Sequence, residues 1–255
     1  EDCVFYAIVL NPTGEPIPEL TPDVARKAPT PALPDKKERV YNKFVDIKLD
    51  ENRTPTSIKY KNYEKFNFAY DVLDAIAKKE PDKLAMLHVS KDKTERRFTF
   101  DEIRRESCRC ANYFKSMGIA KGDKVMLVLK RHYQFWFCML ALHKLGAIVV
   151  PATHLLRKHD IEYRCKAADI HTIVACGDIE IIHHVEAAKS YCPTLKNLVS
   201  IGEIIPKGRK DFHRGINSAA PFISPERNDN TDTMLMYFTF FSMHMTMAMY
   251  VRMFM

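Results

Sequence analysis

Glycine is scarce in this sequence: 8 of its 255 residues are glycine, and none follows Gly215. Glycine lets backbone amides turn through positive φ and approach a bound phosphate closely. The sequence contains no GxGxxG or Walker-type glycine loop and no GxSxG nucleophile elbow. The patterns of Rossmann dinucleotide binding, P-loop nucleotide binding and serine-hydrolase catalysis are therefore absent, and they identify no catalytic residue here.

Cysteine pairs of the CxxC type are also absent. The seven cysteines are an odd number, and Cys108 and Cys110 have no histidine partner at a metal-binding spacing. His183 and His184 are adjacent, so on a helix they point in different directions. We therefore expect no metal site. Most of the cysteines lie in apolar periodic segments, which predicts reduced thiols in or near the core and a reducing compartment, the cytoplasm.

Charge of one sign is not concentrated in any segment. The formal net charge is +7, but basic pairs such as Arg104-Arg105 and Lys130-Arg131 are spread between acidic residues. The chain has no stripe of interleaved basic and aromatic residues, which nucleic-acid-binding surfaces show. We therefore expect solvated charged faces and a basic pocket for an anionic ligand, and no nucleic-acid partner.

No apolar signal core opens the chain, which starts at Glu1 without a methionine and is interpreted as a fragment. Methionine is concentrated at the other end, where eight of the 12 lie from Met234 onward. That segment is about as long as a membrane span, near 20 residues. Arg252, His244 and the alternating pattern speak against a span, so none is expected, and a tail anchor stays open as an alternative.

Proline sets the first 60 residues apart from the rest. Eight of the 14 prolines lie there, and their spacing forbids long helices. We predict a flexible, extended or turn-rich N-terminal extension over residues 1–60, in which Val4–Leu10 is the one candidate strand. From residue 61 the pattern becomes that of a globular α/β domain.

The stretch at residues 122–156 organises the rest of the chain. Val125–Leu129 is a continuous apolar run, which indicates a strand buried on both faces. A helix is predicted over Tyr133–Leu145 with Gly146 as its left-handed cap, and Ile148–Val150 form a second strand. Strand, helix and strand over about 30 residues predict a right-handed βαβ unit with parallel strands.

The predicted helix at Tyr133–Leu145 is apolar on most sides. Only Gln134 and Lys144 clearly need water, so we expect the helix to be covered except near these two residues. Trp136, the one tryptophan of the chain, is expected to lie buried between this helix and the sheet.

Strands and helices alternate over the rest of the domain. A capping box at Thr99–Glu102 begins a helix that Gly118 ends. The inward stripe of this helix is predicted to consist of Ile103, Ser107, Cys110, Ala111 and Phe114. Further helices are predicted at Tyr70–Lys79, Asp160–Ala168, Ile179–Lys189 and Phe212–Ser218, and strands at Leu84–Val89, Arg97–Phe100, His171–Ala175, Leu198–Ile201 and Met234–Thr239. The predicted fold class is α/β, with a mainly parallel sheet and helices on both faces.

Six segments between residues 63 and 239 agree with one family in order and spacing. They are Phe66–Asp74, Phe98–Glu102, Gly118–Val125, Leu145–Thr153, Asp160–Arg164 and Leu235–Thr239. Together they resemble the N-terminal portion of the AMP-forming acyl-CoA synthetases of the adenylate-forming superfamily, in particular the acetyl and medium-chain branch. The resemblance implies that residues 61–255 form the first α/β subdomain of the family's large N-terminal domain.

The resemblance also implies a two-step ligase reaction. ATP, with Mg²⁺, and a short- or medium-chain carboxylate give an acyl-adenylate and pyrophosphate, and coenzyme A then displaces AMP to form a thioester. In the family, later motifs bind adenine and ribose, and a C-terminal lid supplies a catalytic lysine. Neither has a counterpart before Met255, so the chain as written is expected to be an inactive N-terminal portion when alone.

The segment after Thr239 departs from the family. After a strand ending in Phe-Thr, the family has Ser-Gly-Thr-Thr(or Ser)-Gly-x-Pro-Lys, whereas this chain has Phe240–Met247, without glycine or lysine. Thr239 alone matches and is the one candidate cofactor-binding residue, for an ATP phosphate. Because bulky residues at positive φ cost about 1–2 kcal/mol each, this segment is not expected to cradle phosphates.

Several alternatives stay open at this point. The atypical tail from about residue 240 is interpreted as a reading-frame error or gene decay after Thr239, or as a real tail. The chain is either the N-terminal portion of a ligase or a non-catalytic pseudoenzyme or interaction module of the same descent. An aryl-CoA ligase or a peptide-synthetase adenylation domain is a further alternative, although Phe66–Asp74 favours the acetyl and medium-chain branch.

Overall fold

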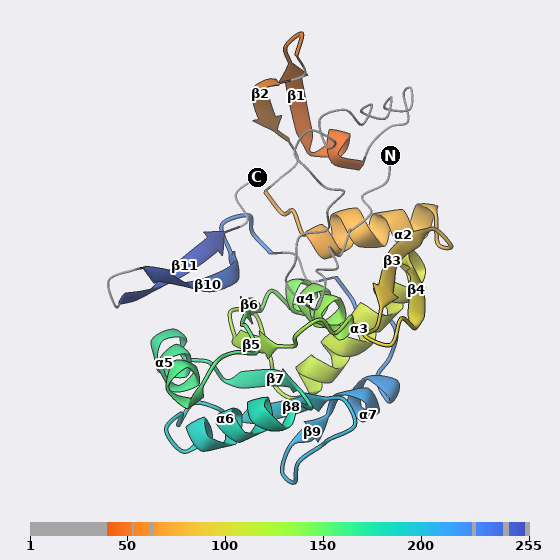
Figure 1. The fold of residues 1–255 in the computed structure, drawn as a ribbon. Helices are drawn as coiled ribbons and strands as arrows, with labels where there is room; N and C mark the ends of the chain where they lie inside the picture. The colour runs from red at the N-terminus through yellow and green to blue at the C-terminus, as the bar shows by residue number, and fades with distance from the viewer. Residues whose placement is uncertain (1–39, 53, 62–63, 226–227, 242–244, 253–255) are drawn as a thin grey trace, which may run out of the picture.

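A seven-stranded sheet lies at the centre of the computed structural model, which describes residues 40–52, 54–61, 64–225, 228–241 and 245–252 (Figure 1). In spatial order the strands are β11 (Met245–Arg252), β10 (Thr233–Phe241), β6 (Ile148–Pro151), β5 (Lys124–Val128), β7 (Thr172–Cys176), β8 (Asn197–Ile201) and β9 (Lys210–Asp211). All neighbouring pairs are parallel except β10 and β11, which run antiparallel. The predicted mainly parallel α/β sheet is confirmed.

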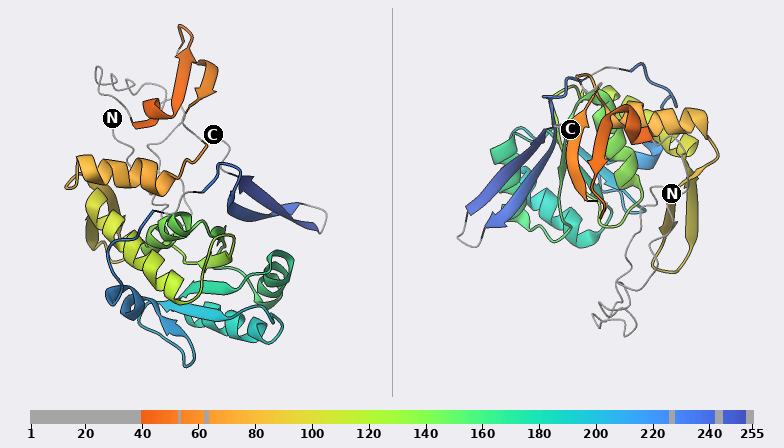
Figure 2. Two further views of the ribbon diagram at one scale, coloured as in Figure 1. Left: turned by 180° about the vertical axis from the view of Figure 1, so that it is seen from behind. Right: turned by 90° about the horizontal axis from the view of Figure 1, so that it is seen from above.

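Helices cover both faces of the sheet (Figures 1 and 2). They are α3 (Phe100–Ser116), α4 (Gln134–Leu145), α5 (Lys158–Ala168), α6 (Ile179–Lys189) and α7 (Phe212–Asn217). Because β6 and β7 flank β5 on opposite sides, right-handed crossovers through α4 and α5 leave on opposite faces. Accordingly α5 packs beside α6, while α3 packs against α4 and α7. The side chains of Val125, Met126 and Leu127 in β5 are fully buried between these layers.

The predicted capping box positions α3. The Thr99 side chain accepts a hydrogen bond from the Glu102 backbone N–H, and the Glu102 carboxylate accepts one from the Thr99 N–H. Two free amides at the start of the helix are thereby satisfied. The predicted apolar stripe of α3 is buried against α4 and the sheet, including Ile103, Ala111 and Phe114. The capping box and the stripe are both confirmed.

Residues 40–60 contain regular structure where the sequence predicted a flexible extension. A 3₁₀ turn, η1 (Val40–Lys43), precedes an antiparallel hairpin of β1 (Val45–Leu49) and β2 (Pro55–Tyr60). The prolines do not prevent the hairpin, because they cluster before residue 35 and only Pro55 lies within it. Pro55 is the first residue of its strand, where a proline is tolerated. The candidate strand Val4–Leu10 lies outside the described residues.

The helix predicted at Tyr70–Lys79 is present in two parts. A π-helical turn, η2 (Ala69–Asp74), continues into α2 (Ala75–Lys79). β3 (Leu84–Val89) and β4 (Glu95–Thr99) follow as a separate antiparallel pair, close to the predicted bounds. Asn67 precedes η2, and its side-chain oxygen accepts a hydrogen bond from the Ala69 N–H at 3.0 Å. η2, α2, β3 and β4 all pack against α3, and η2 also packs against α4.

Three expectations for α4 are wrong. Trp136 is 36% exposed and packs edge-on against Phe135 rather than between helix and sheet. Gln134 and Lys144, expected to face water, are buried. Because α4 is apolar on nearly every side, its sequence does not determine which face meets the sheet. The structure also supplies partners for Lys144 from other helices, which a pattern along α4 does not reveal.

The tail continues the sheet. β10 extends past Thr239 to Phe241, and β11 pairs with it in an antiparallel register that sets Thr239 opposite Met247. Among the described residues, no helix combines the length and the apolar character that crossing a membrane requires.

Candidate active-site edge

The carboxyl ends of β10, β6, β5, β7 and β8 lie along one edge of the sheet. In open α/β sheets, ligands bind outside this edge, where neighbouring strands lead to helices on opposite faces. That condition holds on both sides of β5, because α4 leaves on one face and α5 and α6 leave on the other. The loops after these strands are therefore the candidate active-site region.

Thr239 lies on β10 at this edge. Next to it, the Phe238 ring lies 5.2 Å from the Arg164 guanidinium and 6.1 Å from the Tyr163 ring, both of α5. The backbone of Thr239 is part of the β10–β11 ladder, which continues through Phe241. The structure does not describe the Thr239 side chain, so its role as a phosphate ligand stays a prediction.

The described backbone after Thr239 does not form a phosphate cradle. A cradle needs successive amides that turn through left-handed conformations toward the anion. The ladder instead pairs Phe240 with Thr246 and Phe241 with Met245 in extended structure. Positive φ values among the described residues occur elsewhere in the chain. These residues do not fit the triphosphate of ATP or its Mg²⁺.

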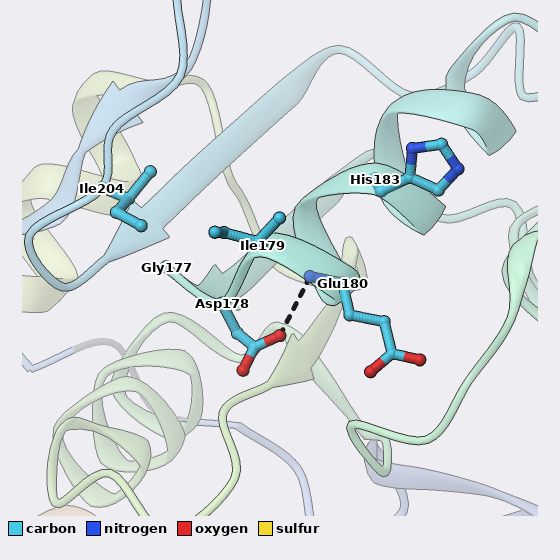
Figure 3. Close-up of a pocket in the computed structure, with 6 residues that line it drawn as sticks. All are labelled: Gly177, Asp178, Ile179, Glu180, His183 and Ile204. Atoms are coloured by element: carbon cyan, nitrogen blue, oxygen red, sulfur yellow. Dashed lines mark hydrogen bonds between the residues drawn. The ribbon is translucent and has the colours of Figure 1, made fainter.

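A shallow pocket opens farther along the same edge, between the ends of β7 and β8 (Figure 3). Its lining residues are Gly177, Asp178, Ile179, Glu180, His183 and Ile204. Ile179 is 73% exposed, and Figure 3 shows it beside Ile204, with the two carboxylates directed away from Ile204. The strands β6 and β5 separate this pocket from β10.

Asp178 is the N-cap residue of α6. Its Oδ1 accepts hydrogen bonds from the Glu180 and Ile181 N–H groups at 3.1 and 3.4 Å. Its Oδ2 lies 2.5 Å from Nζ of Lys130, the residue that follows the buried run of β5. This hydrogen bond to Lys130 is the main reason why the pKa of Asp178 lies below its usual range. The helix amides and a nearby ammonium group are therefore already satisfied, and the pocket presents apolar surface and carboxylates rather than a phosphate site.

Aromatic and basic side chains gather where β5 leads into α4. The Arg96 guanidinium donates to the Tyr133 hydroxyl and lies 5.1 Å from the centre of the Tyr133 ring. Burial, with the nearby charges of His88, Lys130 and His213, lowers the pKa of His132, so His132 is neutral at pH 7. Because Lys130 is already paired with Asp178, the expected basic pocket for an anionic ligand has Arg96 as its candidate cation beside β5, and it stays a prediction.

This grouping was not predicted from the sequence. Arg96 lies on β4, which pairs with β3, whereas Tyr133 directly precedes α4. Only the fold brings the two side chains together. A sequence signal was nonetheless present at Lys130, because polar residues directly after a buried parallel strand lie at the edge where ligands bind. In the described part of the chain, no three histidine, cysteine or acidic side chains are arranged to hold a metal ion.

Comparison with known proteins gives the family. The profile of the AMP-binding enzyme family matches residues 73–239. Rat acyl-coenzyme A synthetase ACSM5, mitochondrial, is 31% identical over 182 residues, which are 69% of this chain and 31% of the rat protein. Human acyl-coenzyme A synthetase ACSM1, mitochondrial, is 32% identical over 197 residues, which are 75% of this chain and 34% of the human protein.

Solved structures show the same fold. The anthranilate CoA ligase AuaEII, in complex with anthranoyl-AMP, superposes with a TM-score of 0.67 at 21% identity, over 74% of this chain and 35% of that one. An acyl-CoA synthetase from Brucella canis superposes with a TM-score of 0.64 at 21% identity, over 74% and 33%.

The chain spans about one third of the length of the curated relatives that it matches. The family profile ends at Thr239, the residue at which the family's phosphate loop was expected to begin. The matched segment, residues 73–239, contains the βαβ units around β5 and most of β10, the strand that reaches the candidate active-site edge at Thr239. The chain therefore belongs to the AMP-binding enzyme family, and within it is similar to acyl-coenzyme A synthetases.

Proposed function

We propose that this chain is the N-terminal α/β part of an ATP-dependent ligase that activates a short- or medium-chain carboxylate as acyl-AMP and transfers it to coenzyme A. The observation that carries the proposal is the family match over residues 73–239, together with relatives named acyl-coenzyme A synthetases. ATP, Mg²⁺, coenzyme A and the carboxylate are the substrates and cofactors of the whole enzyme in this proposal. We also infer a reducing compartment such as the cytoplasm, because the six described cysteines are free and buried.

In this ligase the chain contributes scaffold rather than chemistry. The parallel strands from β10 to β8 align their carboxyl ends, and the connections on opposite faces of the sheet open the edge where ligands bind. The residues present at the end of β10 do not fit a phosphate group, so no step of adenylation is assigned to them. The catalytic lysine and the nucleotide-binding motifs of the family are not matched by any residue of this chain.

A second candidate function is a non-catalytic module of the same descent. The extended β10–β11 ladder favours it, because that ladder lies where the family's phosphate loop would turn. The two functions differ in what the scaffold can support once a phosphate loop is supplied. If the scaffold is that of a ligase, residues 63–239 retain the geometry that the rest of the enzyme needs.

A chimera tests the proposal. Residues 63–239 of this chain would replace the matching segment of the full-length human relative, which keeps its own phosphate loop and later domains. We expect ATP-dependent pyrophosphate release with short or medium-chain carboxylates. The matched control carries residues 63–255, so that the β11 segment displaces the loop, and it should be inactive. A well-folded first chimera without pyrophosphate release would contradict the ligase proposal and support the non-catalytic module.

A further inference from the structure

A buried lysine, a thiol and a carboxylate meet where α4, α3 and η2 pack together. Lys144, near the end of α4, has a fully buried side chain, and its Nζ lies 3.0 Å from Asp74 Oδ1 at the end of η2. The same Nζ lies 3.2 Å from Sγ of Cys108 on α3, and Cys108 is 3% exposed. The group lies near the carboxyl end of α4, whereas the candidate active-site edge adjoins its amino end.

The neighbouring groups fix the lysine in place. The Tyr70 hydroxyl donates to the Lys144 carbonyl at 3.2 Å, and its ring centre lies 5.6 Å from Nζ. The nearest pair of other thiols, Cys110 and Cys138, have their sulfur atoms 4.0 Å apart and contact each other. The partner that the structure gives the sulfur of Cys108 is therefore an amine rather than a second thiol.

The carboxylate can accept a proton from the amine. Burial raises the pKa of Asp74, while the neighbouring Lys144 ammonium lowers it. Asp74 Oδ1, 3.0 Å from Nζ, is therefore placed to accept a proton from Nζ as the nitrogen bonds to the sulfur. The Asp74 side chain is 21% exposed, so it lies between the buried amine and solvent.

We propose that Cys108 and Lys144 form a sulfur–nitrogen cross-link, a sulfenamide, when a hydroperoxide oxidises the thiol. In the first step, with hydrogen peroxide as the oxidant, the thiol sulfur attacks one peroxide oxygen: the O–O bond breaks, an S–O bond forms, and the leaving hydroxide takes the thiol proton and departs as water. The sulfur loses two electrons, and the peroxide gains them. In the second step Lys144 Nζ attacks the sulfenic sulfur while Asp74 accepts a proton from Nζ: an S–N bond forms, the S–O bond breaks, and the hydroxyl leaves as a second water with a further proton from Nζ.

The environment favours this product over the usual ones. A sulfenic acid normally condenses with a second thiol, or is oxidised further when it stays exposed. At Cys108 the contacting nucleophile is an amine held at 3.2 Å, and the burial of the sulfur hinders soluble thiols from reaching it. The cross-link would covalently join α3 to α4 and remove the positive charge that Asp74 faces.

Peptide mapping of the oxidised full chain tests the proposal. The purified chain would be treated with hydrogen peroxide, digested without reductant, and analysed by mass spectrometry. We expect the peptide with Cys108 joined to the peptide with Lys144, with the loss of two hydrogens, and its release by dithiothreitol. Cys108 recovered as a free thiol, as sulfinic or sulfonic acid, or in a disulfide would overturn the proposal.

Variants separate the chemistry from general oxidation. Lys144→Met replaces the amine by a side chain of similar length and should abolish the cross-linked peptide. The control Cys138→Ser removes a different buried thiol, on α4, and should leave the cross-linked peptide intact. Asp74→Asn removes the proton acceptor and should slow cross-linking. If Lys144→Met does not fold, the peptide map of the oxidised chain without substitutions still decides the question. An Asp74→Asn variant that forms the cross-link as fast as the parent would contradict the assigned role of Asp74.

Discussion

The side-chain amide of Asn67 donates a hydrogen bond to the main-chain carbonyl of His143 at 2.8 Å, although the two residues are 76 positions apart. His143 lies in the last turn of α4, and its carbonyl also accepts a hydrogen bond from the N–H of the cap residue Gly146 at 3.1 Å. The Asn228 amide donates to the same carbonyl at 3.3 Å. Two loops distant in sequence thus meet at the end of the helix that joins β5 to β6.

Asn67→Ala should lower the free energy of unfolding by about 1–3 kcal/mol, because it leaves a buried carbonyl without its shortest hydrogen bond and removes the acceptor for the Ala69 N–H. Urea unfolding followed by circular dichroism measures the change. Asn217→Ala at an exposed position is the control and should change stability by less than about 0.5 kcal/mol. Equal effects in the two variants would contradict the role given to Asn67.

Gly146→Ala should destabilise the chain more than Gly118→Ala. Both glycines have positive φ, 67° and 83°, which costs an L-residue about 1–2 kcal/mol. At Gly146 a Cβ would also lie 2.5 Å from Asn228 Oδ1, whereas at Gly118 nothing lies within 4 Å. Alanine at residue 146 should therefore also displace Asn228 from the end of α4. Thermal unfolding of the two variants provides the comparison, and a larger effect at residue 118 would be inconsistent with this packing.

Stability should fall as the pH is lowered from about 6.5 toward 4. Burial lowers the pKa of His143 from 6.5 to about 4 in the folded chain. Between these values the unfolded chain binds a proton on His143 that the folded chain does not, so this contribution is complete above pH 6.5 and is lost as the pH falls. The full loss amounts to roughly 3 kcal/mol.

The variant His143→Leu isolates this residue from other histidines whose pKa is also lowered by burial, such as His132. Urea unfolding at several pH values gives the slope of the unfolding free energy against pH. Between pH 6.5 and 4 this slope should be smaller in the variant, by the equivalent of up to one bound proton. An unchanged slope would mean that His143 is not the residue whose protonation is linked to unfolding.

Trp136→Ala should cost much less stability than Phe137→Ala, although tryptophan is the larger side chain. Trp136 is 36% exposed, and Phe137 is 3% exposed and packs edge-on against Phe98. Truncation of a buried phenylalanine costs about 3–5 kcal/mol, and we expect Trp136→Ala to cost less than half as much. Chemical denaturation of both variants gives the ratio. A larger loss of stability in Trp136→Ala than in Phe137→Ala would support the orientation of α4 that was expected from the sequence.

These residues also show where sequence information ends. The Thr99–Glu102 box and the β5–α4–β6 unit were predictable, because their signals lie within a few residues of one another. The orientation of α4 was not, because a helix that is apolar on nearly every side has no preferred face in its pattern. Lys144 illustrates the same limit, since its partners Asp74 and Cys108 come from elements far away in the sequence.

The tail was predictable in part. The strand ending near Thr239 and the loss of the family's glycines could be seen in the sequence. Its pairing with a further strand could not, because β-ladder partners are set by register across a hairpin rather than by local composition.

Calorimetric titration of the full chain with ATP and Mg²⁺ tests the central claim most directly, namely that the segment after Thr239 does not cradle phosphates. One hydrogen bond from a threonine hydroxyl contributes about 0.5–1.5 kcal/mol, whereas even millimolar affinity corresponds to about 4.1 kcal/mol. We predict no saturable ATP binding below millimolar concentration and no pyrophosphate release with short or medium-chain carboxylates. Saturable binding at micromolar ATP would show that other groups hold the phosphates, and it would contradict the account.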